Sequence, residues 1–275
     1  MDHELRPGFA VSASYIWRKY DRFAWNDRRD FTSADYVARS YTPPASLCPA
    51  GARCGTSTYY EPTVPIPAAY VYTNVPDRYR DYNGFELEAR KRYANRWMLI
   101  ASYAFNSAVD RWDSPNAYED PTNITMLSGA QYAPETSGSG IDNVFTNAKW
   151  LVKVQGLYTL PWWEVNLSGF YNARQGYPFP QAVQTPARAN RAGIALVLLD
   201  PMGDVRLPNL QTIDFRVEKP FTFGRAKVSP TLDIFNLGNV NTVLAQRRNQ
   251  AASNANVVSG IVAPRVMRFG VRVTW

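Results

Sequence analysis

The final segment of the chain has the clearest alternation of apolar and polar positions. Between residues 264 and 275, one face would carry Met267, Phe269, Val271, Val273 and Trp275, and the other Val266, Arg268, Gly270, Arg272 and Thr274. A period of two predicts a β-strand whose faces meet different surroundings. The segment is long enough to cross a membrane as a tilted strand.

Seven other segments repeat this alternation. We predict about eight long strands, at roughly 9–20, 81–93, 95–107, 148–160, 163–173, 208–220, 224–236 and 263–275. Each is close to the length of a transmembrane strand, about 9–11 residues plus overhang. A soluble sheet can alternate in the same way. Inside lipid, however, every backbone group must be paired, so strands in a membrane require a closed barrel.

The connections between these strands alternate in length. Short ones fall at 93–95, 160–162 and 220–224, and long ones at about 23–80, 107–147, 174–207 and 237–262. Outer-membrane barrels have short periplasmic turns and long extracellular loops. The sequence therefore predicts an all-β fold, a segment of an antiparallel transmembrane β-barrel spanning residues 1–275, with the last strand ending at the periplasmic side.

Composition fits this fold. Hydrophobic residues make up 45% of the 275 residues and aromatic residues 14%. A set of rings near the predicted strand ends suits a membrane interface: Trp17, Tyr20, Tyr93, Trp97, Trp162, Trp163 and Phe221. The net charge of +7 is spread along the chain and mixed with acids. Without a recognition module it favours membrane lipid and lipopolysaccharide phosphates over nucleic acid.

No apolar run is long enough for a membrane helix, which needs about 20 residues. The first residues, Met1 to Gly8, lack the charged and apolar regions of a signal peptide. We therefore expect the chain to be a fragment whose export signal lies upstream. Cys48 and Cys54 lie in a Pro-rich loop. They are either a small disulfide or two free thiols, and the even count with an exported context favours the disulfide.

Catalytic chemistry is not expected. The one histidine, His3, lies outside the predicted strands, whereas a rim hydrolase needs a positioned histidine. We expect no metal site and no cofactor. The acidic pairs at 110 and 113 and at 119–120 offer too few ligands for calcium and are interpreted as solvated loop charges.

Two sets of residues face the expected lumen and the outside. Charges on the polar faces either line a polar lumen for plug or substrate, or form cross-strand ion pairs; they are Glu86, Glu88, Arg90, Arg96, Asp214, Arg216, Glu218, Arg268 and Arg272. Rings in the long loops either contact a ligand or pack the loops together; they are Trp25, Tyr36, Tyr59, Tyr60, Trp112 and Tyr118, with Tyr41, Tyr70, Tyr72 and Tyr132 beside them.

The segment from Leu207 to Phe221 resembles a late barrel strand of TonB-dependent receptors. The stretch from Leu232 to Asn239 resembles the "D-x-F-N-L-x-N" motif of the same family. The closing Pro264 to Arg272 is similar to "P-R-x-x-R-x-G-x-R", and Tyr82 to Leu87 to "Y-x-G-x-E-L". Gln175 to Pro178 looks like a loop entry. The terminal aromatic, Trp275 where that family most often has Phe, resembles the signal read by the barrel-assembly machinery.

The best match is to Oar-like receptors, whose full chains carry a carboxypeptidase-regulatory-like domain. This resemblance implies a Gram-negative outer-membrane location and energised uptake of a bulky nutrient. It implies contact with TonB through an N-terminal part, including a plug domain, that we do not find in this sequence. The family barrel has about 22 strands, so this chain would supply its C-terminal third. The alternative is a complete eight-stranded barrel with a structural or adhesin-like role.

Overall fold

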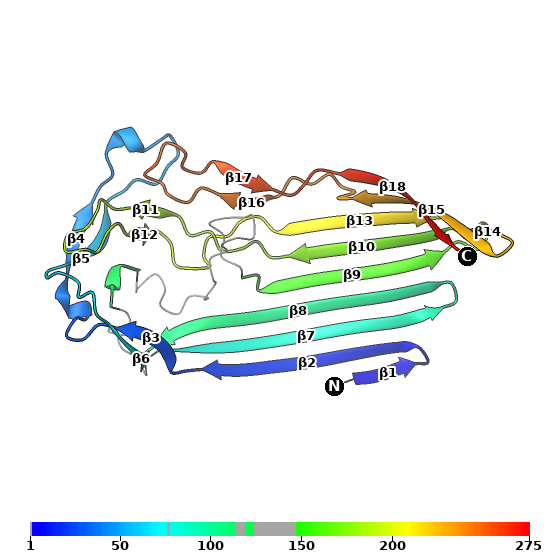
Figure 1. The fold of residues 1–275 in the computed structure, drawn as a ribbon, viewed down its shortest axis with the longest axis horizontal. Coiled ribbons are helices and arrows are strands. Elements are labelled where there is room, and N and C mark those ends of the chain that lie inside the picture. Colours follow the sequence, from blue (N-terminus) through cyan, green and yellow to red (C-terminus); the bar gives the residue numbers. More distant parts are fainter. Residues whose placement is uncertain (1, 76–77, 114–118, 124–146) are drawn as a thin grey trace.

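The computed structural model describes residues 2–75, 78–113, 119–123 and 147–275. One antiparallel sheet of ten strands dominates these residues (Figure 1). In spatial order it comprises β1 (Asp2–Arg6), β2 (Phe9–Tyr20), β7 (Arg78–Ala94), β8 (Trp97–Trp112), β9 (Trp150–Thr159), β10 (Asn166–Arg174), β13 (Leu210–Glu218) and β15 (Ala226–Phe235), with β14 (Phe221–Phe223) and β18 (Val266–Thr274) both paired to β15. The predicted all-β, antiparallel fold is confirmed.

All eight predicted strands are present, as β2, β7, β8, β9, β10, β13, β15 and β18. The pattern of alternation missed two short strands of the main sheet. β1 precedes β2 as a hairpin arm, and β14 occupies part of the connection that was predicted to be a turn at 220–224. Both have few residues, so they carry too little alternation to be recognised.

The pairing register keeps the polar positions of all these strands on one face. Asp233 of β15 lies opposite Arg216 of β13 and Arg268 of β18. Following the register from strand to strand, Arg216 lies opposite Ser168, and Glu88 opposite Ser12 and Ser102. A register slip by one residue would move a strand's whole polar set to the other face. The sheet thus has one polar and one apolar face from β2 to β18.

The turns at one end of the sheet are tight. Between β7 and β8, Asn95 and Arg96 both have positive φ, 54° and 71°. Two successive positive φ values are typical of the type I′ turn, whose twist matches that of a hairpin. The hairpin of β1 and β2 turns at Gly8, with φ 77°, and that of β14 and β15 turns at Gly224, with φ 57°.

The long connections lie together at the opposite end and form small sheets of their own (Figure 1). These are the hairpins β3 (Phe23–Asp27) with β6 (Val71–Val75), β4 (Tyr36–Tyr41) with β5 (Ser57–Pro62), β11 (Ala182–Gln184) with β12 (Leu196–Leu198), and β16 (Val243–Gln246) with β17 (Val258–Ile261). The 3-10 turns in the described part of the chain accompany them, η1 (Ser33–Asp35), η2 (Ala45–Leu47) and η4 (Pro121–Asn123). Among the described residues no helix is long and apolar enough to cross a membrane.

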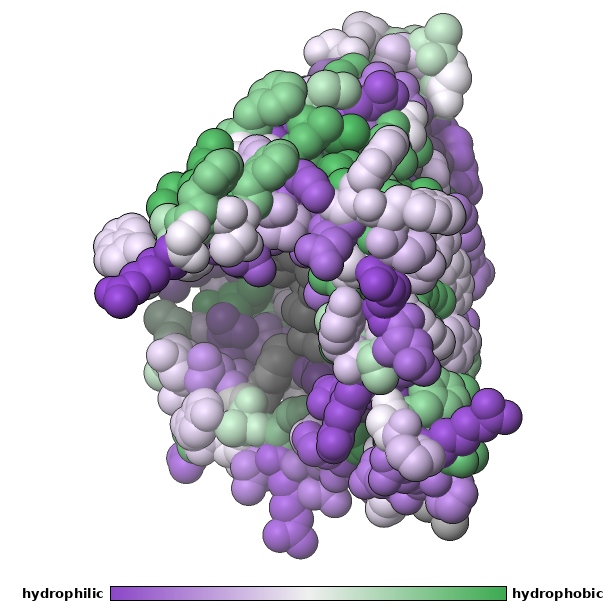
Figure 2. Space-filling model, turned by 90° about the vertical axis from the view of Figure 1, so that its right-hand side faces the viewer, coloured by the Kyte–Doolittle hydropathy of each residue, from purple (hydrophilic) through white to green (hydrophobic). Residues whose placement is uncertain are grey.

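The apolar face of the main sheet is uncovered. Phe269 is 78% exposed, Tyr15 68% and Val271 66%, and they lie on strands near both edges of the sheet. Figure 2, seen along the strands from the tight-turn end, shows a hollow open on one side, with apolar side chains gathered on the outer surface. The buried apolar side chains lie instead in the long connections, apart from Ala173 at the end of β10. This distribution is inverted relative to that of a water-soluble sheet.

Candidate functional site: the loop cap

The four long connections interlock into one assembly, which we call the loop cap. It consists of the first loop (residues 21–75), the second loop (described at 119–123 and 147–149), the third loop (175–209) and the fourth loop (236–265). Because loops carried by a rigid sheet are the usual place for binding residues, the contacts between them define the candidate site.

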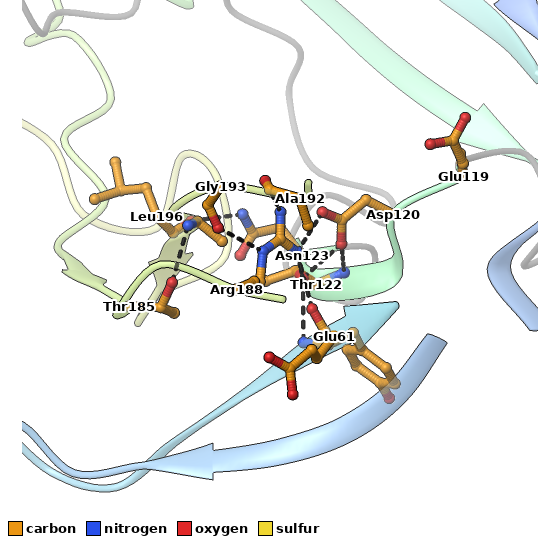
Figure 3. A network of polar contacts seen from close by, with 12 residues as sticks. Glu61, Glu119, Asp120, Thr122, Asn123, Thr185, Arg188, Ala192, Gly193 and Leu196 are labelled. Atoms are coloured by element: carbon orange, nitrogen blue, oxygen red, sulfur yellow. Dashed lines mark hydrogen bonds and ion pairs between the residues drawn. The ribbon is translucent and has the colours of Figure 1, made fainter. Parts of the chain in front are cut away.

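Arg188 of the third loop is the central node of the cap (Figure 3). Its guanidinium donates to the carbonyl oxygen of Tyr60 at 2.8 Å and to Asp120 Oδ2 at 2.6 Å. It also donates to the carbonyl oxygens of Ala192 at 3.1 Å and Gly193 at 3.3 Å. The side chain is only 6% exposed. One planar fork of donors therefore ties the first, second and third loops together.

Polar contacts around Arg188 also join the first and second loops to the third. The side chain of Asn123 makes two hydrogen bonds with the backbone of β12. It donates to Leu196 O at 2.8 Å and accepts from Leu198 N at 2.9 Å. Glu61 accepts from the backbone N–H of Ala189 at 2.9 Å and from Arg39 at 3.1 Å. These two bonds, the backbone one first, lower the pKa of Glu61 below its usual value.

A second node joins the first loop to the third and fourth. The Arg53 guanidinium binds both carboxylate oxygens of Asp200, at 2.7 and 2.8 Å, and Gln181 Oε1 at 3.1 Å. Its backbone N–H donates to Gln250 Oε1 at 3.1 Å. The neighbouring Cys54 is joined to Cys48 by a disulfide, with Cα atoms 6.1 Å apart. The disulfide restricts the turn that presents Arg53.

The third and fourth loops pair along their backbones. Ala182 N donates to Arg248 O at 3.0 Å, and Gln250 N donates to Ala182 O at 2.8 Å. Gln250 is fully buried, and its amide also exchanges hydrogen bonds with Asn256 at 2.9 and 3.2 Å. Residues of these two loops also form two small apolar clusters. One consists of Ala182, Leu198 and Met202, and the other of Phe179, Leu207 and Ala245.

The base of the third loop requires glycine at position 176. A Cβ added to Gly176 would overlap the carbonyl oxygen of Leu207, because the entering and leaving chains touch there. Leu207 N donates to Tyr177 O at 2.9 Å, and Arg206 donates to Gly176 O at 3.0 Å. Burial lowers the pKa of Arg206 from its ordinary value. The glycine lets two backbones approach closely, which closes the loop at its root.

The predicted ring residues lie in different surroundings. Tyr36, Tyr59 and Tyr60 are half-buried in the hairpin of β4 and β5, and Trp112 is half-buried at the end of β8. Tyr41 is half-buried, whereas Tyr70 and Tyr72 are exposed. Trp25 lies on β3. Tyr118 and Tyr132 lie outside the described residues.

Tyr36 shows what the half-buried rings contact. Its ring packs edge-on against Phe31 with centroids 5.5 Å apart. Burial of the hydroxyl, followed by the nearby charges of Asp120 and Glu119, raises the pKa of Tyr36 to about 12. Glu119 is itself paired with Arg28 at 2.7 Å. The acids at 119 and 120 are thus partners of arginines from other loops, and not solvated charges.

The polar face of the sheet carries its own charge network below the cap. Asp233, with a side chain 6% exposed, lies between Arg216 and Arg268 and binds both. Arg272 reaches Glu218 at 2.7 Å across the intervening β15. Cross-strand pairs of this kind match the second interpretation of the predicted lumen charges.

The other predicted lumen charges are placed less uniformly. Glu88 pairs with Arg90 at 3.0 Å. Asp214 accepts from the backbone N–H of Asn236 at 2.8 Å, which holds the entry to the fourth loop. Glu86 lies on the polar face and is exposed. Arg96 differs from the prediction: it lies in the turn after β7, where the chain reverses, and belongs to neither face.

Within the described parts of the chain, no group of three or more His, Cys, Asp or Glu side chains is placed to hold a metal ion. His3 lies exposed on β1 at the edge of the sheet. The described part of the cap offers hydrogen bonding and charge, supplied by arginines, carboxamides and backbone groups.

Sequence reasoning missed the residues that assemble the cap. Arg53, Asn123, Arg188, Asp200 and Gln250 each contact a partner more than 60 residues away in the chain. No local motif marks such contacts. The available signal is weak: single charged or carboxamide residues inside loop segments that are otherwise rich in small and apolar residues.

Comparison with known proteins gives a likeness of shape only. No protein-family model matches the sequence, and no curated protein matches it. Among solved structures, the outer membrane transporter YddB from Escherichia coli matches with a TM-score of 0.48 and 12% identity over 98% of this chain and 31% of its own. BauA, the ferric preacinetobactin receptor from Acinetobacter baumannii, matches with a TM-score of 0.46 and 12% identity, over 98% of this chain and 28% of its own.

A third structure, the ferripyoverdine receptor of the outer membrane of Pseudomonas aeruginosa, matches with a TM-score of 0.45 and 12% identity over 98% of this chain and 31% of its own. The chain spans about a third of the length of these structures.

Proposed function

We propose that this chain forms the C-terminal wall and loop cap of a TonB-dependent receptor in a bacterial outer membrane, which takes up a bulky nutrient. One observation carries the proposal. The register keeps an uncovered apolar face along eight long strands, while the described parts of the long connections lie at the same end. An apolar outer face with long loops at one rim is the arrangement that lipid and an outer surface require.

The open edges of the sheet favour a larger barrel over an eight-stranded one. Closing eight strands would require β18 to pair with β2, but the outer edge of β2 is already paired with β1. Among the described residues no pairing joins β18 to β1. Unpaired edges in lipid would be costly, so further strands outside this chain would complete the wall.

The sequence resemblance supports the receptor role, the Oar-like subtype and the partners that we propose. TonB and a plug domain would act through a part of the receptor outside residues 1–275. The barrel-assembly machinery would read the last strand, and lipopolysaccharide would surround the rim. The loop cap would bind the nutrient, because its loops converge from all four long connections.

Surface labelling tests the location and the orientation together. Ser259→Cys places a thiol on the exposed β17 of the cap, and Thr222→Cys places one on the exposed β14 at the opposite end. The native cysteines are bonded to each other, so they give little background. In intact cells, an impermeant maleimide should label the first variant and reach the second only after the outer membrane is permeabilised. Equal labelling of both, or recovery outside the membrane fraction, contradicts the proposal.

Cross-linking tests the larger barrel against the complete small one. In the pair Ser12→Cys with Thr274→Cys, both thiols lie on the polar face of strands that a closed eight-stranded barrel would bring together. Lys227→Cys with Thr274→Cys is the matched positive control, because these residues lie opposite each other. We expect efficient bonding of the control pair alone. Equally efficient bonding of the first pair would establish the small barrel.

A further inference from the structure

A basic pocket lies between the third and fourth loops of the cap. It has a volume of about 440 Å³, a size suited to a small molecule. One wall is the hairpin of β11 and β12 with its connecting turn, and the other is the turn between β16 and β17. The two walls are held together by the backbone bonds of Ala182 to residues 248 and 250, so the pocket is formed before any ligand arrives.

The lining of this pocket is positive and rich in hydrogen-bond donors. Arg247, Arg248, Gln184, Asn249 and Asn254 line it, and no Asp or Glu is among the described residues that do. The fourth loop contributes to this imbalance, because the sequence has no acidic residue after Asp233. A negative group placed here would meet attraction without a competing carboxylate.

Arg247 is the residue best placed to bind such a group. Its side chain is exposed, and within the described part of the chain its guanidinium makes no hydrogen bond or ion pair. Two other arginines of the cap, by contrast, already have carboxylate partners: Arg53 binds Asp200, and Arg188 binds Asp120. A guanidinium presents paired donors that match the two oxygens of a carboxylate or phosphate.

The amide groups of the pocket are oriented by their own contacts. Asn249 Oδ1 accepts from Gln184 N at 3.2 Å, and Asn249 Nδ2 donates to Gln184 Oε1 at 3.3 Å. This pairing occupies the oxygen of Gln184 and leaves its amide N–H groups for a ligand. Ile194 and Leu196 supply apolar surface to the lining of the pocket.

We infer that this pocket binds the portion of the nutrient that carries a carboxylate or phosphate group together with an apolar part. The anionic group lies against Arg247 and the carboxamides, and the apolar part lies against Ile194 and Leu196. The inference deepens the proposed receptor function by naming the class of ligand, and its role in uptake rests on that function.

Binding can be measured on the protein purified from its membrane in detergent. The probe is 4-(trifluoromethyl)benzoate, followed by its fluorine NMR signal, and its neutral amide is the matched ligand control. We expect saturable binding of the acid and no saturable binding of the amide. Arg247→Gln should weaken binding by about tenfold or more, the size expected for loss of a charge-assisted bond.

Arg225→Gln is the matched protein control, because Arg225 is an exposed arginine in the turn at the opposite end of the sheet. It should leave binding unchanged. Equal binding of acid and amide, or unchanged affinity in Arg247→Gln, would overturn the inference. Displacement of the probe by purified lipopolysaccharide would overturn the assignment to a free solute.

The pocket and the receptor function can fail separately. If the probe binds as expected but the surface-labelling experiment places the protein elsewhere, the pocket stands and the receptor function falls. If labelling succeeds and the probe does not bind, the location stands and the anionic ligand class falls.

Discussion

Arg188 and Asp120 are joined across 2.6 Å, although 68 residues separate them in the chain. They belong to two different long connections, and the same guanidinium also holds the backbone of Tyr60 from a third. A contact of this kind converts loops that would otherwise move independently into a single body. The loop cap therefore presents its pocket as part of a connected structure.

We expect Arg188→Ala to loosen the cap without unfolding the barrel wall. The change removes the guanidinium from Asp120 and from the carbonyl oxygens of Tyr60, Ala192 and Gly193, which should cost about 1–3 kcal/mol of local stability. Hydrogen exchange should become faster in β5 and in residues 185–196 while β13 and β15 stay protected. Arg29→Ala, at an exposed arginine of the first loop, is the control. Equal protection in both variants would show that Arg188 does not join the loops.

The titration of Tyr36 reports on the same region. Its folded pKa of about 12 lies above the ordinary tyrosine value of 10.0, so the folded cap holds the proton more tightly than the unfolded chain. The stabilisation is complete below pH 10 and is lost as pH rises from 10 to 12. The difference in tyrosinate absorbance between wild type and Tyr36→Phe should appear near pH 12. A midpoint near pH 10 would contradict the burial of this hydroxyl.

Asp233 should matter more than other acids of the polar face. Asp233→Asn leaves Arg216 and Arg268 beside each other with a neutral partner, which should cost about 1–3 kcal/mol after allowance for the exposure of both arginines. Glu86→Gln, the same chemical change at an exposed position of that face, should cost much less. Urea unfolding of the protein folded in lipid vesicles measures both. Equal midpoints would mean that the network around Asp233 does not stabilise the wall.

The disulfide should control the position of Arg53. Reduction, or Cys48→Ser with Cys54→Ser, removes the restraint on the turn that brings Arg53 to Asp200. We expect trypsin to cleave after Arg53 several-fold faster in the reduced protein, because local opening precedes proteolysis. Cleavage after Arg39, which lies on β4 and pairs with Glu61, is the internal control. Unchanged cleavage after Arg53 would show that Asp200 and the third loop hold this turn alone.

Gly176→Ala should disrupt the root of the third loop. The added Cβ meets backbone, which cannot rotate away as a side chain can. We expect a cost of about 1–3 kcal/mol, in the range of overpacking, and weaker probe binding in the cap pocket. Gly169→Ala in β10, where a Cβ would meet nothing within 4 Å, is the control. A neutral Gly176→Ala would indicate that the two chains separate freely at this point.

The sequence by itself determined the main sheet. Alternation identified all eight long strands, because a strand between lipid and lumen must change polarity at every residue, and that requirement is local. It also determined which face of the sheet carries Arg216, Arg268 and Arg272. Alternate residues of a strand share a face, so the face of each residue is fixed once the strands pair without a register slip. Arg96 escaped this logic because the strand predicted to contain it begins one residue later, at Trp97, and Arg96 lies in the turn before it.

Only the tertiary structure decided how the loops assemble. The partners of Arg53 and Arg188 are set by the folding of four connections against one another, and no period or motif encodes which arginine meets which acid. The basic pocket likewise combines Gln184 with Arg247, residues from different loops. Strand patterning reflects the surroundings that each residue meets, whereas loop chemistry depends on contacts between distant segments, which appear only when the chain is folded.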